Sequence, residues 1–154
     1  MVCLGNICRS PIAEGVLQYK AKQKGLDWEI ESAGTNSYHT GEAPHRFSQK
    51  VCRARGIDIS GQRARTFTAA DLGRYDLIYA LAGDVYRDIS RICGSGADLS
   101  NVHYFMNELE PGSNGSVPDP WYGDEDGYAP VYDMIARTCD AIIARYGNDN
   151  NINT

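Results

Sequence analysis

The sequence predicts a single α/β domain, an α/β sandwich in which helices cover both faces of a parallel sheet. Segments with helical and with strand periodicity alternate along the chain, a pattern that favours parallel strands joined by helical crossovers. A continuous apolar run at residues 77–81 is typical of a strand buried on both faces. The last helical segment has one apolar face. We expect one domain over residues 1–147 and a polar tail over 148–154.

The first part of the chain predicts two helices and one strand. Pro11 stands where a first helical residue would be, and Gly25 is a natural stop for the helix. Residues 28–33 alternate between apolar and polar side chains, which indicates a strand. A second helix is expected over residues 45–55, ended by Gly56.

The second part of the chain predicts three helices and two strands. Residues 68–71 resemble a capping box that opens a short helix, and residues 77–81 form the buried strand. A helix near 84–93 and a strand at 102–106 follow. The last helix places on one face Val131, Met134, Ile135, Thr138, Cys139, Ile142, Ile143 and Tyr146.

The start of the chain conflicts with this pattern. A helix opening at Pro11 needs a preceding strand to form a right-handed βαβ unit, yet only Met1 and Val2 precede Cys3. Strands are usually about 5–6 residues long, so two residues are too few for a useful buried strand. We therefore expect residues upstream of Met1, native or from a tag, to complete it.

Composition excludes several classes of protein. Hydrophobic residues make up 42% and charged residues 23%, as in ordinary globular proteins. The net charge of −5 disfavours nucleic acid or an anionic membrane as a partner, and no apolar run approaches the ~20 residues that span a bilayer. The odd number of cysteines, five, argues against a disulfide framework, and the chain does not begin like a signal peptide. We predict a cytoplasmic protein.

The segment from Cys3 to Pro11 has the composition of an oxyanion cradle. Five residues between Cys3 and Arg9 can curl so that backbone N–H groups point inward, and the following helix adds its positive end. Gly5 and Asn6 are suited to left-handed backbone, which a tight cradle requires. There Cys3 would be a nucleophilic thiolate, and Arg9 would bind two phosphate oxygens. Ser10 would hydrogen-bond the sulfur and ease its departure.

A cysteine five residues before an arginine is by itself a weak signal. The same spacing recurs at Cys139 and Arg145, where it lies in the last helix with Cys139 on the apolar face, so we interpret that pair as part of the core. The alternative for Cys3 is a buried strand cysteine followed by an ordinary turn. Its nine-residue context argues against this.

A second segment supplies a candidate general acid. Asp119 lies between two prolines that would fix its position, and Trp121 and Tyr122 beside it could wall an aromatic substrate. A solvated acidic loop is an equally good interpretation from spacing alone, because residues 124–126 are all acidic.

Together, CLGNICRSP near the start and DPWYG near the end resemble the low-molecular-weight protein tyrosine phosphatases. Further matches in the same order are SAGT at 32–35, Gly41 with Pro44, and the stretches 56–58 and 63–65, so the likeness covers nearly the whole chain. The resemblance implies a flavodoxin-like three-layer sandwich with strand order 2-1-3-4. It also implies hydrolysis of phosphotyrosine in proteins through a phosphocysteine intermediate, without metal or cofactor.

The resemblance also assigns roles to residues. Cys3 is the nucleophile, Arg9 the phosphate clamp and Asp119 the general acid and then base. The phosphate-binding loop and its support are Leu4, Gly5, Asn6, Ile7, Cys8, Ser10 and Ser32; the walls of the substrate pocket are Leu4, Tyr38, Trp121 and Tyr122. As in the family, Cys8 could form a reversible disulfide with Cys3 that protects the nucleophile from over-oxidation.

Two positions depart from the family pattern. Gln62 replaces a histidine, and we expect it to donate to Asn6 in a weakened but working network. Ala82 replaces an aspartate at the end of the third strand, which removes support for the rim of the pocket. These changes keep a non-catalytic phosphopeptide-binding relative open as an alternative.

The sequence disfavours three other functions. An arsenate reductase of this fold needs a close cysteine pair, whereas Cys52, Cys93 and Cys139 are far apart in the sequence. A phosphoarginine phosphatase has threonine where this chain has Ile7, whose apolar bulk suits a flat phosphotyrosine ring better. A metalloenzyme is disfavoured because the histidines, His39, His45 and His103, fall in three different elements and are expected to be surface or packing residues.

The expected partners are phosphotyrosine-containing proteins. An autophosphorylated tyrosine kinase is one candidate substrate if the source is bacterial. The aromatic rim of the pocket is compatible with a monomer or with a weakly self-associating dimer.

Overall fold

The computed structural model describes residues 1–147, apart from the side chain of Tyr122; the expected polar tail lies outside the described residues. The strands are β1 (Val2–Cys3), β2 (Ala33–Gly34), β3 (Ile78–Ala80) and β4 (Val102–Tyr104). The α-helices are α1 (Arg9–Gln23), α2 (Arg46–Arg53), α3 (Asp71–Arg74), α4 (Gly83–Cys93) and α5 (Tyr128–Tyr146), and the 3-10 helices are η1 (Phe105–Glu108), η2 (Pro120–Tyr122) and η3 (Glu125–Gly127).

The four strands form a parallel sheet in the order β2-β1-β3-β4, which confirms the expected fold class and topology. The expectation that two residues are too few for the first strand was wrong. Val2 pairs with Ala33 on one side and Ala80 on the other, and Cys3 pairs with Gly34. A strand flanked on both sides gains ladder bonds from two neighbours, so even a short one is fixed in register.

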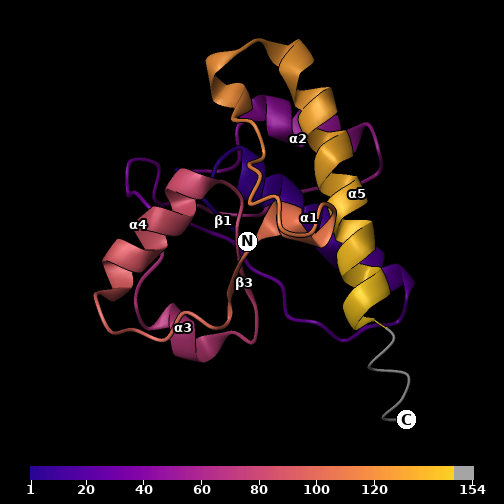
Figure 1. The fold of residues 1–154 in the computed structure, drawn as a ribbon. Coiled ribbons are helices and arrows are strands. Elements are labelled where there is room, and N and C mark those ends of the chain that lie inside the picture. Colours follow the sequence, from indigo (N-terminus) through magenta and orange to yellow (C-terminus); the bar gives the residue numbers. More distant parts are fainter. Residues whose placement is uncertain (148–154) are drawn as a thin grey trace.

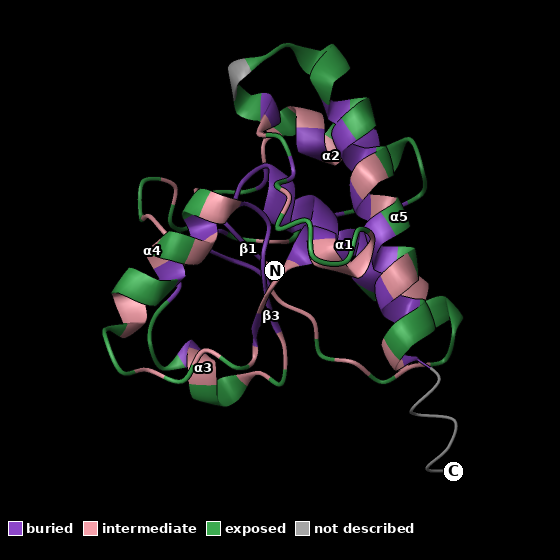
Figure 2. Ribbon diagram, viewed as in Figure 1, coloured by how far each residue is buried: buried purple, intermediate pink, exposed green. Residues whose placement is uncertain are grey.

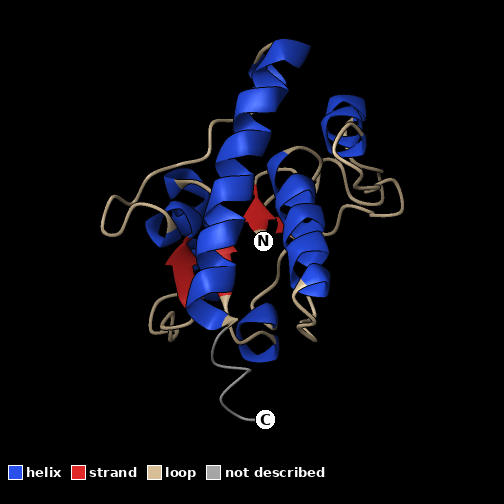
Figure 3. Cartoon of the chain, turned by 90° about the vertical axis from the view of Figure 1, so that its right-hand side faces the viewer, coloured by secondary structure: helices blue, strands red, loops and turns tan. Residues whose placement is uncertain are grey.

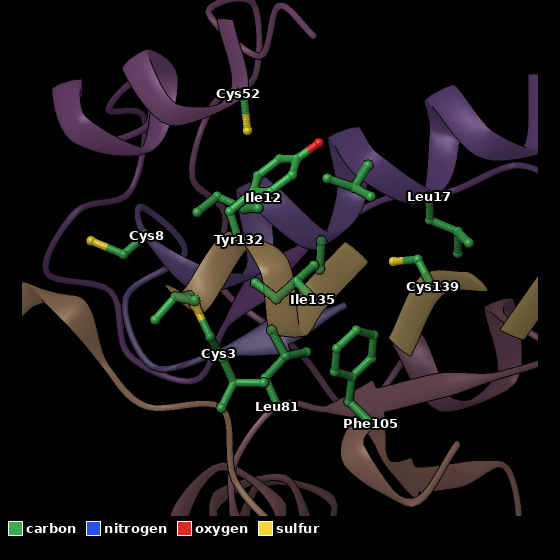
Figure 4. Packing of buried hydrophobic residues seen from close by; sticks show 14 of the residues in the cluster. Cys3, Cys8, Ile12, Leu17, Cys52, Leu81, Phe105, Tyr132, Ile135 and Cys139 are labelled. Atoms are coloured by element: carbon green, nitrogen blue, oxygen red, sulfur yellow. The ribbon is translucent and has the colours of Figure 1, made fainter. Parts of the chain in front are cut away.

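The helices lie in two layers, one on each face of the sheet (Figures 1 and 3). Helices α1, α2 and α5 pack over one face, where Ile12, Leu81, Phe105 and Ile135 belong to the larger core (Figure 4). Helices α3 and α4 cover the other face, with Val85 and other residues in a second cluster. Buried segments follow the sheet and the inward sides of the helices (Figure 2). The eight residues predicted for the inner face of α5 all belong to or pack against the larger core, except Thr138, which is itself fully buried.

Most predicted boundaries differ from the structure by one or two residues, and three differences have a clear position or cause. The strand expected over 28–33 is reduced to β2, because the preceding backbone bonds to other partners; Ile30 O, for example, accepts from the side chain of Gln18. Helix α1 begins at Arg9, two residues before Pro11. The strand expected over 102–106 ends at Tyr104, where the chain turns into η1. Among the described residues, no helix is long and apolar enough to span a bilayer.

Candidate active site

The loop between β1 and α1 turns its carbonyl groups outward. Cys3 O accepts from Thr35 N, Leu4 O from Asn36 N and Ile7 O from His45 N. The hydroxyl of Ser48 donates to Cys8 O. Within the described part of the chain, no acceptor bonds the backbone N–H groups of residues 4–8. Unpaired amides gathered at a helix N-terminus are what an oxyanion requires, so the loop has the form of the predicted cradle.

Asn6 holds this loop in shape. Its φ of 58° is left-handed, as expected, whereas Gly5 is not among the residues with positive φ. Its Oδ1 accepts from Arg65 N at 3.0 Å, which identifies Nδ2 as the donor of two hydrogen bonds, to Ser10 Oγ at 2.7 Å and to Ser32 Oγ at 2.9 Å. Both N–H groups of the Asn6 amide are therefore used in hydrogen bonds to these two hydroxyls.

This arrangement fixes the direction of the next hydrogen bond. Because Ser10 Oγ accepts from Asn6, its own proton is free for Cys3 Sγ, which lies 3.0 Å away. A hydroxyl that donates to sulfur stabilises the thiolate form. At the other end of the chain of bonds, Ser32 Oγ donates to Glu14 Oε1 at 2.7 Å. Burial raises the pKa of this carboxyl, against the hydrogen bond from Ser32.

Arg9 and Asp119 meet beside the loop. Arg9 is 4% exposed; its Nη1 donates to Val117 O at 3.1 Å, and its Nη2 lies 3.5 Å from Asp119 Oδ2. The other carboxylate oxygen, Oδ1, accepts from Trp121 N at 3.0 Å, which caps η2. The acidic residue is thus fixed by two partners and is not part of a freely solvated loop.

These side chains open into one cleft of about 200 Å³. Cys3, Arg9 and Asp119 lie around it, with Tyr38 and Trp121 at its exposed rim, 84% and 47% exposed. The remaining lining residues are Leu4, Gly5, Ile7, Cys8, Asn36 and His39. Asn6, Ser10 and Ser32 support the loop from behind. A thiol, a guanidinium and a carboxyl around an amide-lined cradle can bind a phosphate and transfer it to sulfur.

The family model for low molecular weight phosphotyrosine protein phosphatases matches residues 1–151. The chain belongs to this family. A Synechocystis protein that bears the family's name is 38% identical over 150 residues, covering 96% of this chain and 95% of the relative. The crystal structure of YfkJ from Bacillus subtilis has a TM-score of 0.86 at 32% identity, with 96% of this chain and 92% of that chain covered. An Entamoeba histolytica protein tyrosine phosphatase reaches 0.87 at 30% identity, with 97% and 96% covered.

The low molecular weight phosphatases are hydrolases of phosphoric monoesters, so the chain is an enzyme of that class. Of the two positions that depart from the family pattern, Gln62 behaves differently from expectation. Gln62 does not reach Asn6: its Nε2 donates to Pro11 O at 3.1 Å, and its Oε1 is buried without a partner among the described residues. The third partner of Asn6 is the backbone of Arg65, three residues farther along. Ala82 is buried at the N-cap of α4, and the first turn of that helix carries the carboxylate of Asp84.

Sequence reasoning assigned no role to several residues of this phosphatase site, among them Gly34, Asn36 and His39. A Cβ on Gly34 would lie 2.8 Å from Leu4 O, so only glycine lets β2 approach the loop so closely. His39 lines the cleft, and both His39 and His45 pack against the ring of Trp121, with centroids 5.6 and 5.4 Å apart. The sequence alone does not distinguish these two histidines from ordinary surface histidines, because their role depends on where Trp121 lies in the fold.

Proposed function

We propose that this enzyme hydrolyses phosphotyrosine in proteins through a phosphocysteine intermediate. The observation that carries the proposal is the directed series of hydrogen bonds from Arg65 N through Asn6 and Ser10 to Cys3 Sγ, with Asp119 in the same cleft. That series directs a hydrogen-bond donor, the hydroxyl of Ser10, at the sulfur beside the loop amides. A binding module would have no need of it.

In the first step, the Cys3 thiolate attacks phosphorus while the bond to the tyrosyl oxygen breaks. Asp119, in its protonated form, gives its proton to that leaving oxygen. Arg9 and the loop amides bind the three equatorial oxygens and stabilise the charge that spreads over them.

In the second step, water attacks phosphorus and the S–P bond breaks. Asp119, now a carboxylate, takes the proton from the water, and the products are inorganic phosphate and the Cys3 thiolate. Ser10 donates its hydrogen bond to the departing sulfur, so the same contact assists both steps.

The lining of the cleft supports an aromatic substrate. Ile7 is buried and apolar at the loop position, and Tyr38 and Trp121 are exposed at the rim. Leu4 also lines the cleft, and Tyr122 follows Trp121 in η2. These features favour phosphotyrosine over phosphoarginine, and the partners we propose are phosphotyrosine-containing proteins in the cytoplasm, an autophosphorylated tyrosine kinase among them.

Turnover of p-nitrophenyl phosphate, phosphotyrosine and phosphoarginine tests the proposal. We expect the first two to be hydrolysed, and Cys3→Ser to abolish both activities. Asp119→Asn should lower kcat by about 10²–10⁴. The loss should be larger for phosphotyrosine, because p-nitrophenolate is the better leaving group and needs less protonation. Faster turnover of phosphoarginine would overturn the substrate, and turnover retained by Cys3→Ser would overturn the mechanism.

A further inference from the structure

We propose that His39 is a specificity-determining residue, which together with Glu42 selects substrates that carry a lysine or arginine next to the phosphotyrosine. The proposal rests on the proposed function and adds a substrate class to it. It is carried by the juxtaposition of His39 with the cradle, with Trp121 and with Glu42.

A rigid turn presents both side chains. Glu42 N donates to His39 O at 2.9 Å, and Gly41 between them has a φ of 87°, which favours glycine. The turn is bonded to the body of the domain, because Gly41 N donates to Ala64 O at 2.8 Å and Ala64 N donates to Glu42 O at 2.9 Å. His39 is therefore held at the rim of the cleft, with the carboxylate of Glu42 against its Nδ1.

The His39 ring is fixed from three sides. Its Nδ1 lies 2.9 Å from Glu42 Oε2, its plane is tilted by 58° against Trp121, and its Cδ2 lies 3.1 Å from the position of a Cβ on Gly5. Any side chain larger than hydrogen at Gly5 would push the ring away. The backbone of Gly5 is not left-handed, so glycine is needed here because its missing side chain leaves room for the His39 ring.

The hydrogen bond to Glu42 determines what the other ring nitrogen can do. The carboxylate of Glu42 only accepts, so Nδ1 is the donor of this bond, and the tautomer with its proton on Nδ1 leaves Nε2 as an acceptor. Nε2 lies 3.9 Å from the same point on Gly5, and no hydrogen bond from the described residues satisfies it. An acceptor with a carboxylate behind it is complementary to a cationic donor.

The other charges of the cleft agree with this preference. Among the described residues, Arg9 is the only lysine or arginine that lines it; its side chain is buried, donates to Val117 O and lies beside Asp119. Glu42, by contrast, has a side chain that is 57% exposed. The phosphate has its own binding loop, so the accessible rim is left to present acceptors to residues that flank it.

Kinetics with three matched phosphotyrosine peptides test the proposal, the flanking residue being lysine, alanine or glutamate. At pH 7 and low salt we expect kcat/KM to be about fivefold higher for the lysine peptide than for the glutamate peptide, as is typical of exposed ion pairs. The ratio should approach one in His39→Ala and in Glu42→Gln, and it should shrink in salt. His39→Gln, which retains an acceptor, should restore part of the ratio.

Controls separate this role from a structural one. Glu110→Gln removes an exposed carboxylate outside the cleft, and His103→Ala removes a histidine on β4; both should retain the wild-type ratio. The proposal is overturned if the wild type shows no preference or favours glutamate, or if the cleft variants lose activity equally on all peptides. Because p-nitrophenyl phosphate has no flanking residue, a wild type that hydrolyses it without peptide preference would overturn this inference alone. No turnover of any substrate would overturn the proposed function with it.

Discussion

Cys3 and Cys8 stand at the two ends of one loop, and both are buried, with 2% and 5% of their surface exposed (Figure 4). Their surroundings differ. Cys3 Sγ accepts a hydrogen bond from the hydroxyl of Ser10, whose oxygen accepts from Asn6 Nδ2. Cys8 Sγ lies 3.5 Å from the hydroxyl of Tyr128, and burial raises the pKa of the Cys8 thiol to about 11, against the opposing effect of that hydroxyl.

The comparison shows that burial alone does not make a cysteine reactive. Low exposure favours the neutral thiol, and a donor whose direction is fixed by other bonds favours the anion. Cys3 and Cys8 are only five positions apart, yet one sulfur accepts a hydrogen bond from a directed donor and the other is buried as a neutral thiol. We propose that Cys8 serves as the partner in a reversible disulfide with Cys3 rather than as a nucleophile.

The largest expected difference between Cys3 and Cys8 is in their rates of alkylation and in the activity of their serine variants. At pH 7, a pKa of about 11 leaves roughly one Cys8 in ten thousand as the thiolate. We therefore expect iodoacetamide to modify Cys3 at least about a hundredfold faster than Cys8, with phosphate protecting Cys3. Cys8→Ser should retain most of the turnover that Cys3→Ser abolishes. Equal labelling, read by peptide mass spectrometry, would contradict the assignment.

Replacement of Ser10 tests the contact that distinguishes the two ends. A hydrogen bond to a charged group contributes about 1.5–3 kcal/mol, so Ser10→Ala should lower kcat by roughly ten- to a hundredfold. Loss of assistance to the departing sulfur should also produce a burst of p-nitrophenol before the steady state. Ser48→Ala is the matched control, since Ser48 donates to Cys8 O at the other end. It should reduce stability and change kcat little; the reverse pattern would show that the hydroxyls only support the fold.

A smaller effect is expected for Glu14, whose carboxyl accepts from Ser32 at the end of the hydrogen-bond series that begins at Asn6. Burial raises the pKa of Glu14 above the ordinary 4.5, so the folded state binds this proton more tightly than the unfolded state does. The free energy of unfolding then falls as pH rises through that window. Glu14→Gln should raise the melting temperature at pH 7 and not at pH 4. A lower melting temperature at pH 7 would mean that the charged bond to Ser32 outweighs the cost of burial.

The architecture could be predicted from local patterns where the pattern has a strong period. The inward face of α5 and the buried run at β3 follow from the spacing of apolar residues, and the strand order followed from the resemblance. The prediction of a strand over residues 28–33 was wrong for most of its length. Alternation of apolar and polar residues does not show which group the backbone will bond to, and here the side chain of Gln18 donates to Ile30 O.

Contacts between distant segments could not be predicted. The bond of Gln62 to Pro11 spans 51 residues, and the approach of His39 to Gly5 depends on how the loop after β2 folds back. For the site, the residue types and their order were available from the sequence. The direction of each proton was not, because it depends on Arg65 N reaching Asn6 Oδ1 across 59 residues.

The bond from Arg9 to Val117 O joins residues 108 positions apart, and the contact of Cys8 with Tyr128 joins residues 120 apart. Contacts of such long sequence separation close large loops and form late in folding. The phosphate loop and its acid therefore come together only when nearly the whole domain is assembled. During refolding, catalytic activity should return with the last kinetic phase, after the helical signal in circular dichroism has recovered. A partly folded chain therefore carries the Cys3 thiol before the contacts that surround it in the folded protein have formed.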